Sequence, residues 1–233
     1  MDLLTCYESD SWKILYIYEN NHLISCGSDS LMKVWKINFD FNENNKIGIN
    51  YKLNQIIKEH KYWISSIIQV KNRKKNINYL VSGSGDTAIK YYNVYNNYKL
   101  VHSMDKVICC QQGTLVNYDN KHFLIGGGRG IFFFVVNFVN FQVETKVLGN
   151  NEEVNSILVL KNNKYIKNGG FIIGGKERSF HYVYEKTYKS RIIKYNAHEK
   201  YIYSIVQIGD NLLASSSYDN AIKIWKYNEK TFV

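Results

Sequence analysis

The stretch "LASSSYDNAIKIW" (residues 213–225) decides the fold, because its pattern occurs again elsewhere in the chain. An apolar pair leads through hydroxyl residues into a tight turn, and an alternating apolar run then ends on a tryptophan. The segments "LISCGSDSLMKVW" (23–35) and "LVSGSGDTAIKYY" (80–92) align with it without a gap, and "FLIGGGRGIFFFV" (123–135) and "FIIGGKERSFHYV" (171–183) fit the same frame more weakly. Five copies of one pattern in a single chain indicate a repeat architecture.

Strand-like segments surround each copy. One segment before each copy and one after it alternate between apolar and polar residues, or stay apolar, over the length of a strand. The preceding segments are "SWKILYIYE", "YWISSIIQV", "VICCQQGTLV", "VNSILVLK" and "YIYSIVQIG", and the following ones are "NYKLNQIIK", "YKLVHSM", "FQVETKVL" and "SRIIKYN". Each unit therefore consists of four short strands, and the sequence predicts an all-β fold.

These units resemble the WD40-repeat β-propeller family, whose repeats of about 40–45 residues each form one four-stranded blade. The resemblance covers nearly the whole chain and implies a single β-propeller domain over residues 1–233. We expect five recognisable four-stranded blades, at about 11–58, 62–105, 106–149, 153–196 and 201–227 plus 3–7. Propellers of this family usually have seven blades, so an incomplete propeller, truncated or completed by a partner, is the alternative.

The resemblance also implies a hydrogen-bonded tetrad of His, Ser or Thr, Asp and Trp in each blade. Blade five has all four, and blade two has tyrosine in the tryptophan position. Blade one lacks the histidine, with Ser9 in its place, while Ile125, Arg129, Ile173 and Glu177 replace serine and aspartate in blades three and four. The tetrad residues are His198, Ser215, Asp219 and Trp225; His60, Ser82, Asp86 and Tyr92; and Ser25, Asp29 and Trp35.

Closure of the propeller depends on the two ends of the chain, because an open blade edge exposes unpaired backbone groups. Residues 226–233 are short for a fourth strand after Trp225. We therefore expect Leu3 to Tyr7 to pair with the last blade and close the ring.

Composition fits an intracellular protein. The chain has no CxxC among its four cysteines, no apparent signal peptide, and an apolar run at 131–141 of only about half a membrane span. We predict a cytoplasmic or nuclear protein without a membrane span.

No constellation in the sequence indicates catalysis or a metal site. The six histidines are isolated, and the glycine-rich segments lack the lysine and helix of a phosphate-binding loop. His60, Ser82 and Asp86 resemble a catalytic triad, but the same set recurs at 198, 215 and 219, which favours a structural role. We predict no enzyme, no cofactor and no bound metal.

The remaining candidates are surface residues. By family geometry, one face (the top) carries a candidate protein-binding set: Trp12, Trp63, Tyr201, Arg129, Arg178 and Tyr218. Aromatic and arginine side chains are enriched at interfaces, although the two tryptophans could simply cover blade edges. The sequence therefore predicts a non-enzymatic scaffold or adaptor that binds protein partners of unknown identity.

A basic set on the opposite face supports an alternative function. It consists of Lys71, Arg73, Lys74, Lys75, Lys161 and Lys164, in a chain whose net charge is +10. Such a face suits a nucleic-acid backbone, as in an RNA-processing or ribosome-assembly factor. A solvated lysine surface that reflects biased composition explains the same residues.

Overall fold

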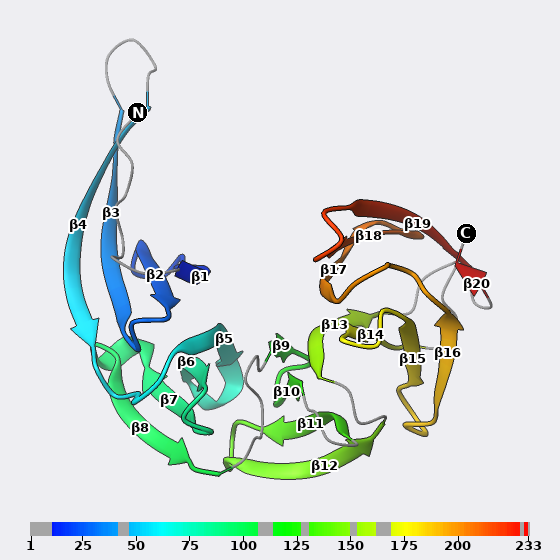
Figure 1. The fold of residues 1–233 in the computed structure, drawn as a ribbon. Coiled ribbons are helices and arrows are strands. Elements are labelled where there is room, and N and C mark those ends of the chain that lie inside the picture. Colours follow the sequence, from blue (N-terminus) through cyan, green and yellow to red (C-terminus); the bar gives the residue numbers. More distant parts are fainter. Residues whose placement is uncertain are drawn as a thin grey trace. The chain divides into compact units, whose positions relative to one another are not determined.

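The computed structural model describes residues 11–41, 47–106, 114–126, 131–149, 153–161, 169–228 and 231–232. By its internal contacts the chain divides into two compact units, Met1–Val107 and Ile108–Val233. Both units are built from four-stranded sheets, with only two short 3-10 helices among the described residues (Figure 1). The strand Leu3 to Tyr7 expected from the sequence lies outside the described residues.

The first unit contains two sheets. Sheet one consists of β1 (Ser11–Ile17), β2 (His22–Gly27), β3 (Met32–Phe41) and β4 (Ile47–Ile57). Sheet two consists of β5 (Ile64–Asn72), β6 (Ile77–Ser84), β7 (Ile89–Asn93) and β8 (Lys99–Met104). The 3-10 helices η1 (Arg73–Lys75) and η2 (Val94–Asn96) connect strands of sheet two.

The second unit contains three sheets. Sheet three consists of β9 (Leu115–Asn117), β10 (His122–Gly126), β11 (Ile131–Asn137) and β12 (Gln142–Leu148). Sheet four consists of β13 (Val154–Leu160), β14 (Gly170–Gly175), β15 (Phe180–Tyr184) and β16 (Ser190–Lys194). Sheet five consists of β17 (Ile202–Gly209), β18 (Leu212–Ser217), β19 (Ile222–Asn228) and β20 (Thr231–Phe232).

All five sheets are antiparallel meanders in which each strand pairs with the next one along the chain. The all-β fold with five four-stranded units is therefore confirmed. The expectation that residues 226–233 are too short for a fourth strand is wrong, because β20 pairs with β19 at Tyr227 and Asn228. This pairing spans only the end of β19, because a two-residue strand reaches no further.

A left-handed residue forms the turn between the second and third strands. It directly follows the position of the tetrad aspartate in four sheets, at Ser30, Thr87, Arg178 and Asn220, where φ lies between 63° and 67°. None of the four is glycine, so the turn's hydrogen bonds offset the strain of this conformation. In sheet five, Asp219 supplies one of them by accepting the backbone N–H of Ala221 at 3.0 Å.

A β-bulge near the start of the first strand sets the register of four sheets. In each case one extra residue of the first strand lies between two residues that pair with neighbours in the second strand. These extra residues are Trp12, Ser65, Asn155 and Tyr203. Trp12 therefore corresponds to Ser65 and Tyr203, and not to Trp63 and Tyr201.

The third repeat carries one extra residue. In the other four sheets the tetrad serine position pairs with the residue eight further on, as in Ser215 with Lys223. In sheet three, Ile125 pairs with Phe134, nine residues away. The gapless alignment of 123–135 therefore needs an insertion, and Val136, rather than Val135, occupies the tryptophan position opposite Phe123.

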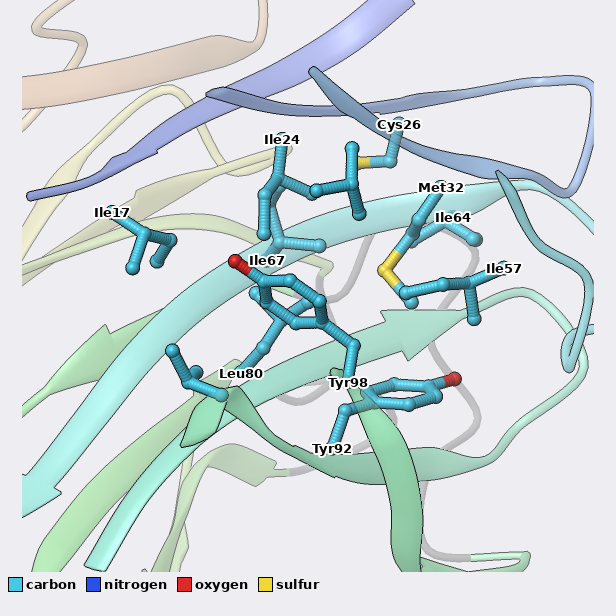
Figure 2. Packing of buried hydrophobic residues seen from close by; sticks show 12 residues of the cluster. Ile17, Ile24, Cys26, Met32, Ile57, Ile64, Ile67, Leu80, Tyr92 and Tyr98 are labelled. Carbon is cyan, nitrogen blue, oxygen red and sulfur yellow. The ribbon is translucent and has the colours of Figure 1, made fainter. Parts of the chain in front are cut away.

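The core of the first unit lies between sheets one and two (Figure 2). Ile24 and Met32 of sheet one are fully buried against Ile64, Leu80 and Tyr92 of sheet two. Figure 2 shows these side chains pointing toward one another from the two sheets. Burial also raises the pKa of Cys26 to about 12, so this thiol is not a reactive nucleophile at neutral pH.

Two apolar clusters hold the second unit together. One packs Trp225 and Ile202 of sheet five against Phe180 and Tyr182 of sheet four. The other joins sheets three and four, with Phe133 and Phe171 at a ring-centroid distance of 4.9 Å. From the apolar run at 131–141, the side chains of Phe132, Phe133 and Val135 are buried in this second cluster.

The hairpin of β3 and β4 is longer than the others and extends as an arm (Figure 1). On one face it pairs Trp35 with Leu53 and Phe39 with Ile49, with an intervening isoleucine–tyrosine pair. Phe39 is 44% exposed and Ile49 is 60% exposed, because this end of the arm has no sheet packed on it among the described residues.

Candidate functional site

Sheet five contains a complete buried hydrogen-bond network. His198 Nδ1 lies 2.8 Å from Asp219 Oδ2, and His198 Nε2 lies 2.7 Å from Ser215 Oγ. Trp225 Nε1–H donates to the same serine oxygen at 2.8 Å. Asp219 also accepts the backbone N–H of Glu199 at 3.0 Å, so the network ties the turn after β18 to the segment that enters β17.

The carboxylate and the hydroxyl on either side of the histidine ring indicate the donor and acceptor role of each of its nitrogens. An ionised carboxylate can only accept, so His198 Nδ1–H donates to Asp219. His198 Nε2 then accepts from the Ser215 hydroxyl, whose oxygen is free to accept from Trp225. Each donor in this arrangement has an acceptor.

Sheet two repeats the network with one change. His60 contacts Asp86 at 2.8 Å and Ser82 at 2.7 Å, and Asp86 accepts the backbone N–H of Lys61 at 3.0 Å. The buried hydroxyl of Tyr92, which replaces the tryptophan, lies near Ser82 but makes no hydrogen bond of normal geometry within the described residues. The substitution therefore keeps the packing but loses one hydrogen bond.

Burial and hydrogen bonding shift the pKa values of this network. Burial lowers the pKa of His60, which keeps the ring neutral. Burial would raise the pKa of Asp86, but the Lys61 amide and the His60 ring outweigh it and hold that pKa below its ordinary value. The same balance, with the amide of Glu199 and the His198 ring, holds the pKa of Asp219 lower still.

Sheets one and four keep parts of the arrangement. In sheet one, Trp35 Nε1–H donates to Ser25 Oγ at 3.0 Å, and Asp29 contacts Lys33 at 3.6 Å. In sheet four the corresponding contact joins Glu177 and His181, which line a small depression together with Phe132. Ile173 is buried in place of the serine, so the fourth sheet replaces its hydrogen-bond network with apolar packing.

Comparison with known proteins agrees with this geometry. Residues 189–226, which contain the complete network, match the family model described as WD domain, G-beta repeat. The solved structure titled "Crystal structure of WD40 beta propeller domain of Doa1" is similar over 93% of this chain and 78% of that chain. Its TM-score is 0.62 at 16% sequence identity.

Residues 189–226 match a WD40 repeat, and the chain shares the fold of a WD40 β-propeller domain. We call the five sheets blades, numbered as the sheets are, and we call the network of sheet five the tetrad. No curated protein sequence matches the chain. WD40 propellers are generally non-enzymatic and commonly act as protein-interaction scaffolds.

Three tyrosines gather on the surface of blade five. Tyr201 and Tyr218 lie with ring centroids 6.4 Å apart and nearly parallel planes, and Tyr203 meets Tyr218 edge-on at 6.0 Å. Their exposed fractions are 44%, 55% and 45%, in the order Tyr201, Tyr218 and Tyr203. The backbone N–H of Tyr218 donates to the carbonyl of Tyr201 at 3.0 Å, which fixes the two loops against each other.

Two lysines complete this surface. Lys200 Nζ lies 5.2 Å from the ring centroid of Tyr218, and Lys176 Nζ, from the turn after β14 of blade four, lies 5.8 Å from that of Tyr201. These distances are those of cation–π contacts. We call these five residues, Tyr201, Tyr203, Tyr218, Lys176 and Lys200, the tyrosine–lysine patch.

The predicted protein-binding residues are only partly brought together. Tyr201 and Tyr218 meet in the patch, and exposed Arg178 donates to the carbonyl of Glu199 at 3.4 Å, beside Lys200. Arg129 lies outside the described residues. Trp12 lies in β1, but its side chain is not among those that the structure describes.

Trp63 belongs to the other unit and covers its own blade. The indole lies against Gly85, where an added Cβ would come within 2.4 Å of the ring. Gly85 N–H also donates to the Trp63 carbonyl at 2.9 Å. This half-buried tryptophan therefore packs on its own sheet, and a role in partner binding remains a prediction.

The basic residues are divided between the two units. Lys71 pairs with Glu19, whereas Arg73, Lys74 and Lys75 form the exposed turn η1. Lys161 is exposed in the second unit, and Lys164 lies outside the described residues. A common basic face remains a prediction.

Sequence reasoning missed Tyr203 and Lys200 as members of the site. Tyr203 occupies the β-bulge of β17, and a bulge redirects side chains at a sheet edge. The bulge is not visible in the alternation of apolar and polar residues. This alternation therefore does not indicate on which face of the sheet the Tyr203 side chain lies. In the described part of the chain, no group of three acidic, histidine or cysteine residues could hold a metal ion, and no helix has the length and hydropathy of a membrane span.

Proposed function

We propose that this chain is a non-enzymatic interaction scaffold that binds a protein partner through the tyrosine–lysine patch. The observation that carries the proposal is the grouping of Tyr201, Tyr203 and Tyr218, each about half exposed, on one surface. Large aromatic side chains lose little conformational entropy on binding and dominate the energetics of protein interfaces. Arg178 at the margin supplies a second side-chain type that is enriched there.

The rigid mounting of the patch supports the same function. The tetrad of blade five fixes the turn that carries Tyr218 against the segment that enters β17, through Asp219 and the Glu199 amide. A preorganised surface binds more tightly, because less conformational freedom is lost on association. The tetrad thus holds the patch in place and contacts no partner itself.

Affinity capture from a lysate, with nuclease treatment, tests the proposal. Wild type is compared with a Tyr201→Ala/Tyr218→Ala variant and with Tyr195→Ala, a change at a tyrosine that is 71% exposed outside the patch. Circular dichroism first establishes that all three are folded. We expect protein partners that resist nuclease, that Tyr195→Ala retains and that the double variant loses.

Two results would overturn the proposal. Partners retained equally by the double variant would remove the patch from recognition. Partners released by nuclease and insensitive to the tyrosines would move the function to nucleic acid.

A further inference from the structure

The tyrosine–lysine patch carries its own carboxylate. Glu153, directly before β13, lies 3.3 Å from Lys176 Nζ, and the two side chains are 37% and 38% exposed. The same Lys176 faces the ring of Tyr201 at 5.8 Å. One ammonium group therefore contacts a negative charge and an aromatic face at once.

The backbone of Glu153 is held in place more firmly than its side chain. Its carbonyl accepts the backbone N–H of Lys176 at 3.0 Å, and a Cβ added at Gly175 would come within 1.9 Å of that oxygen. The side chain is half in water, where an ion pair contributes little and is readily exchanged. A second carboxylate can thus replace it without disturbing the fold.

We propose that the patch recognises an acidic peptide segment that also carries an aromatic or large apolar residue. In this arrangement a partner carboxylate takes the place of Glu153 on Lys176, and a second one approaches Lys200. The apolar residue of the partner lies against the exposed rings of Tyr201 and Tyr218. Glu153 then competes with the partner for Lys176. This inference rests on the proposed function and specifies the chemistry of the partner.

Charge and geometry favour an acidic partner over a basic one. Both ammonium groups already lie over the exposed aromatic faces, so a cationic ligand would meet two like charges there. A carboxylate instead gains two attractions, and the rings below shield them in part from water. Electrostatic complementarity of this kind selects partners and steers their approach.

Fluorescence anisotropy with a labelled peptide tests the inference. The probe is a 12-residue peptide of Asp, Glu, Leu and Phe, and its neutral counterpart replaces Asp with Asn and Glu with Gln. We expect saturable binding of the acidic peptide that weakens as salt rises. We expect Lys176→Glu/Lys200→Glu to weaken it by about tenfold or more, and Glu153→Gln to tighten it several-fold.

A matched control separates local from global charge. Lys146→Glu/Lys189→Glu makes the same change in net charge at two exposed lysines outside the patch, one in β12 and one directly before β16. This variant should bind the acidic peptide within about twofold of wild type. Equal loss in both double variants would mean attraction by net charge alone and would overturn the inference.

The remaining outcomes are distinguishable from failure of the proposed function. Absence of binding, or equal binding of the neutral peptide, overturns the acidic specificity. If captured partners depend on Tyr201 and Tyr218 but not on Lys176 and Lys200, the scaffold function stands and the acidic partner is wrong. If they depend on none of these side chains, both proposals fail.

Discussion

At the scale of single residues, the tetrad shows that a tyrosine can occupy the position of a tryptophan without making its hydrogen bond. Trp225 and Tyr92 occupy the same position in blades five and two, and both are buried. Trp225 donates to its serine, whereas the hydroxyl of Tyr92, although it lies near Ser82, makes no hydrogen bond of normal geometry in the described part of the chain. A buried polar group without a partner loses its hydration and gains nothing in return.

This difference predicts opposite effects of two substitutions by phenylalanine. Tyr92→Phe removes an unpaired hydroxyl, so we expect the free energy of unfolding to stay the same or rise by up to about 1 kcal/mol. Trp225→Phe removes the indole N–H and part of the buried ring, and should lower it by roughly 1–3 kcal/mol. Urea denaturation followed by circular dichroism measures both. A loss of more than about 1 kcal/mol in Tyr92→Phe would show that its hydroxyl is hydrogen-bonded.

The sequence was most informative for these residues. The family resemblance that serine, aspartate and tryptophan carry implied hydrogen bonds that blades two and five contain. Tyr203 was not predicted, since a bulge of one residue leaves the apolar pattern almost unchanged. The pair of Glu177 and His181 was also missed, because it follows the spacing of Asp29 and Lys33 with different residue types.

At the scale of elements, the four-stranded units were predictable and the loops between them were less so. Residues 40–48 resemble a polar insertion in the sequence, yet both ends of this stretch continue β3 and β4 as paired strands. The alternation of Phe39 with polar neighbours was too short to indicate this. The extra residue of the third repeat was not predicted either, because its glycine-rich sequence does not indicate how many residues separate the second strand from the third.

The arm formed by β3 and β4 provides a prediction at this scale. Asn38 pairs with Asn50, so replacing residues 39–49 by Asn-Gly would close the hairpin with a two-residue turn. The removed end includes Phe39 and Ile49, both largely exposed, and we expect the melting temperature to change by no more than about 3 °C.

Thermal melting followed by circular dichroism measures this effect. Met32→Ala, at a buried position of the same strand, is the comparison and should lower stability by about 2–5 kcal/mol. A large fall in melting temperature for the shortened arm would show that its end packs on another part of the molecule.

At the scale of the whole molecule, several titratable groups change the free energy of unfolding with pH in the same direction. Hydrogen bonds hold the pKa values of Asp86, Asp119 and Asp219 below the ordinary value of 3.8, although burial opposes them. Burial lowers the pKa of His60 from 6.5. In every case the unfolded chain binds protons at a higher pH than the folded chain does.

The free energy of unfolding must therefore fall as the pH falls. The loss should begin near pH 6.5, where unfolded histidine takes up its proton, and steepen near and below pH 4 as the carboxylates follow. The net charge of +10 at pH 7 rises over the same range, and this self-repulsion adds to the loss.

Asp219→Asn isolates the contribution of one carboxylate. An amide in this position cannot take the ionised form, so the variant should melt lower than wild type at pH 7, where the native Asp219 is charged. Below about pH 4 the unfolded wild type is protonated at this position, and the gap between the two melting temperatures should narrow. Asp210→Asn, at an exposed residue in the turn before β18, should follow wild type throughout. A gap that stays constant from pH 7 to pH 3 would mean that Asp219 acts through the shape of the turn and not through its charge.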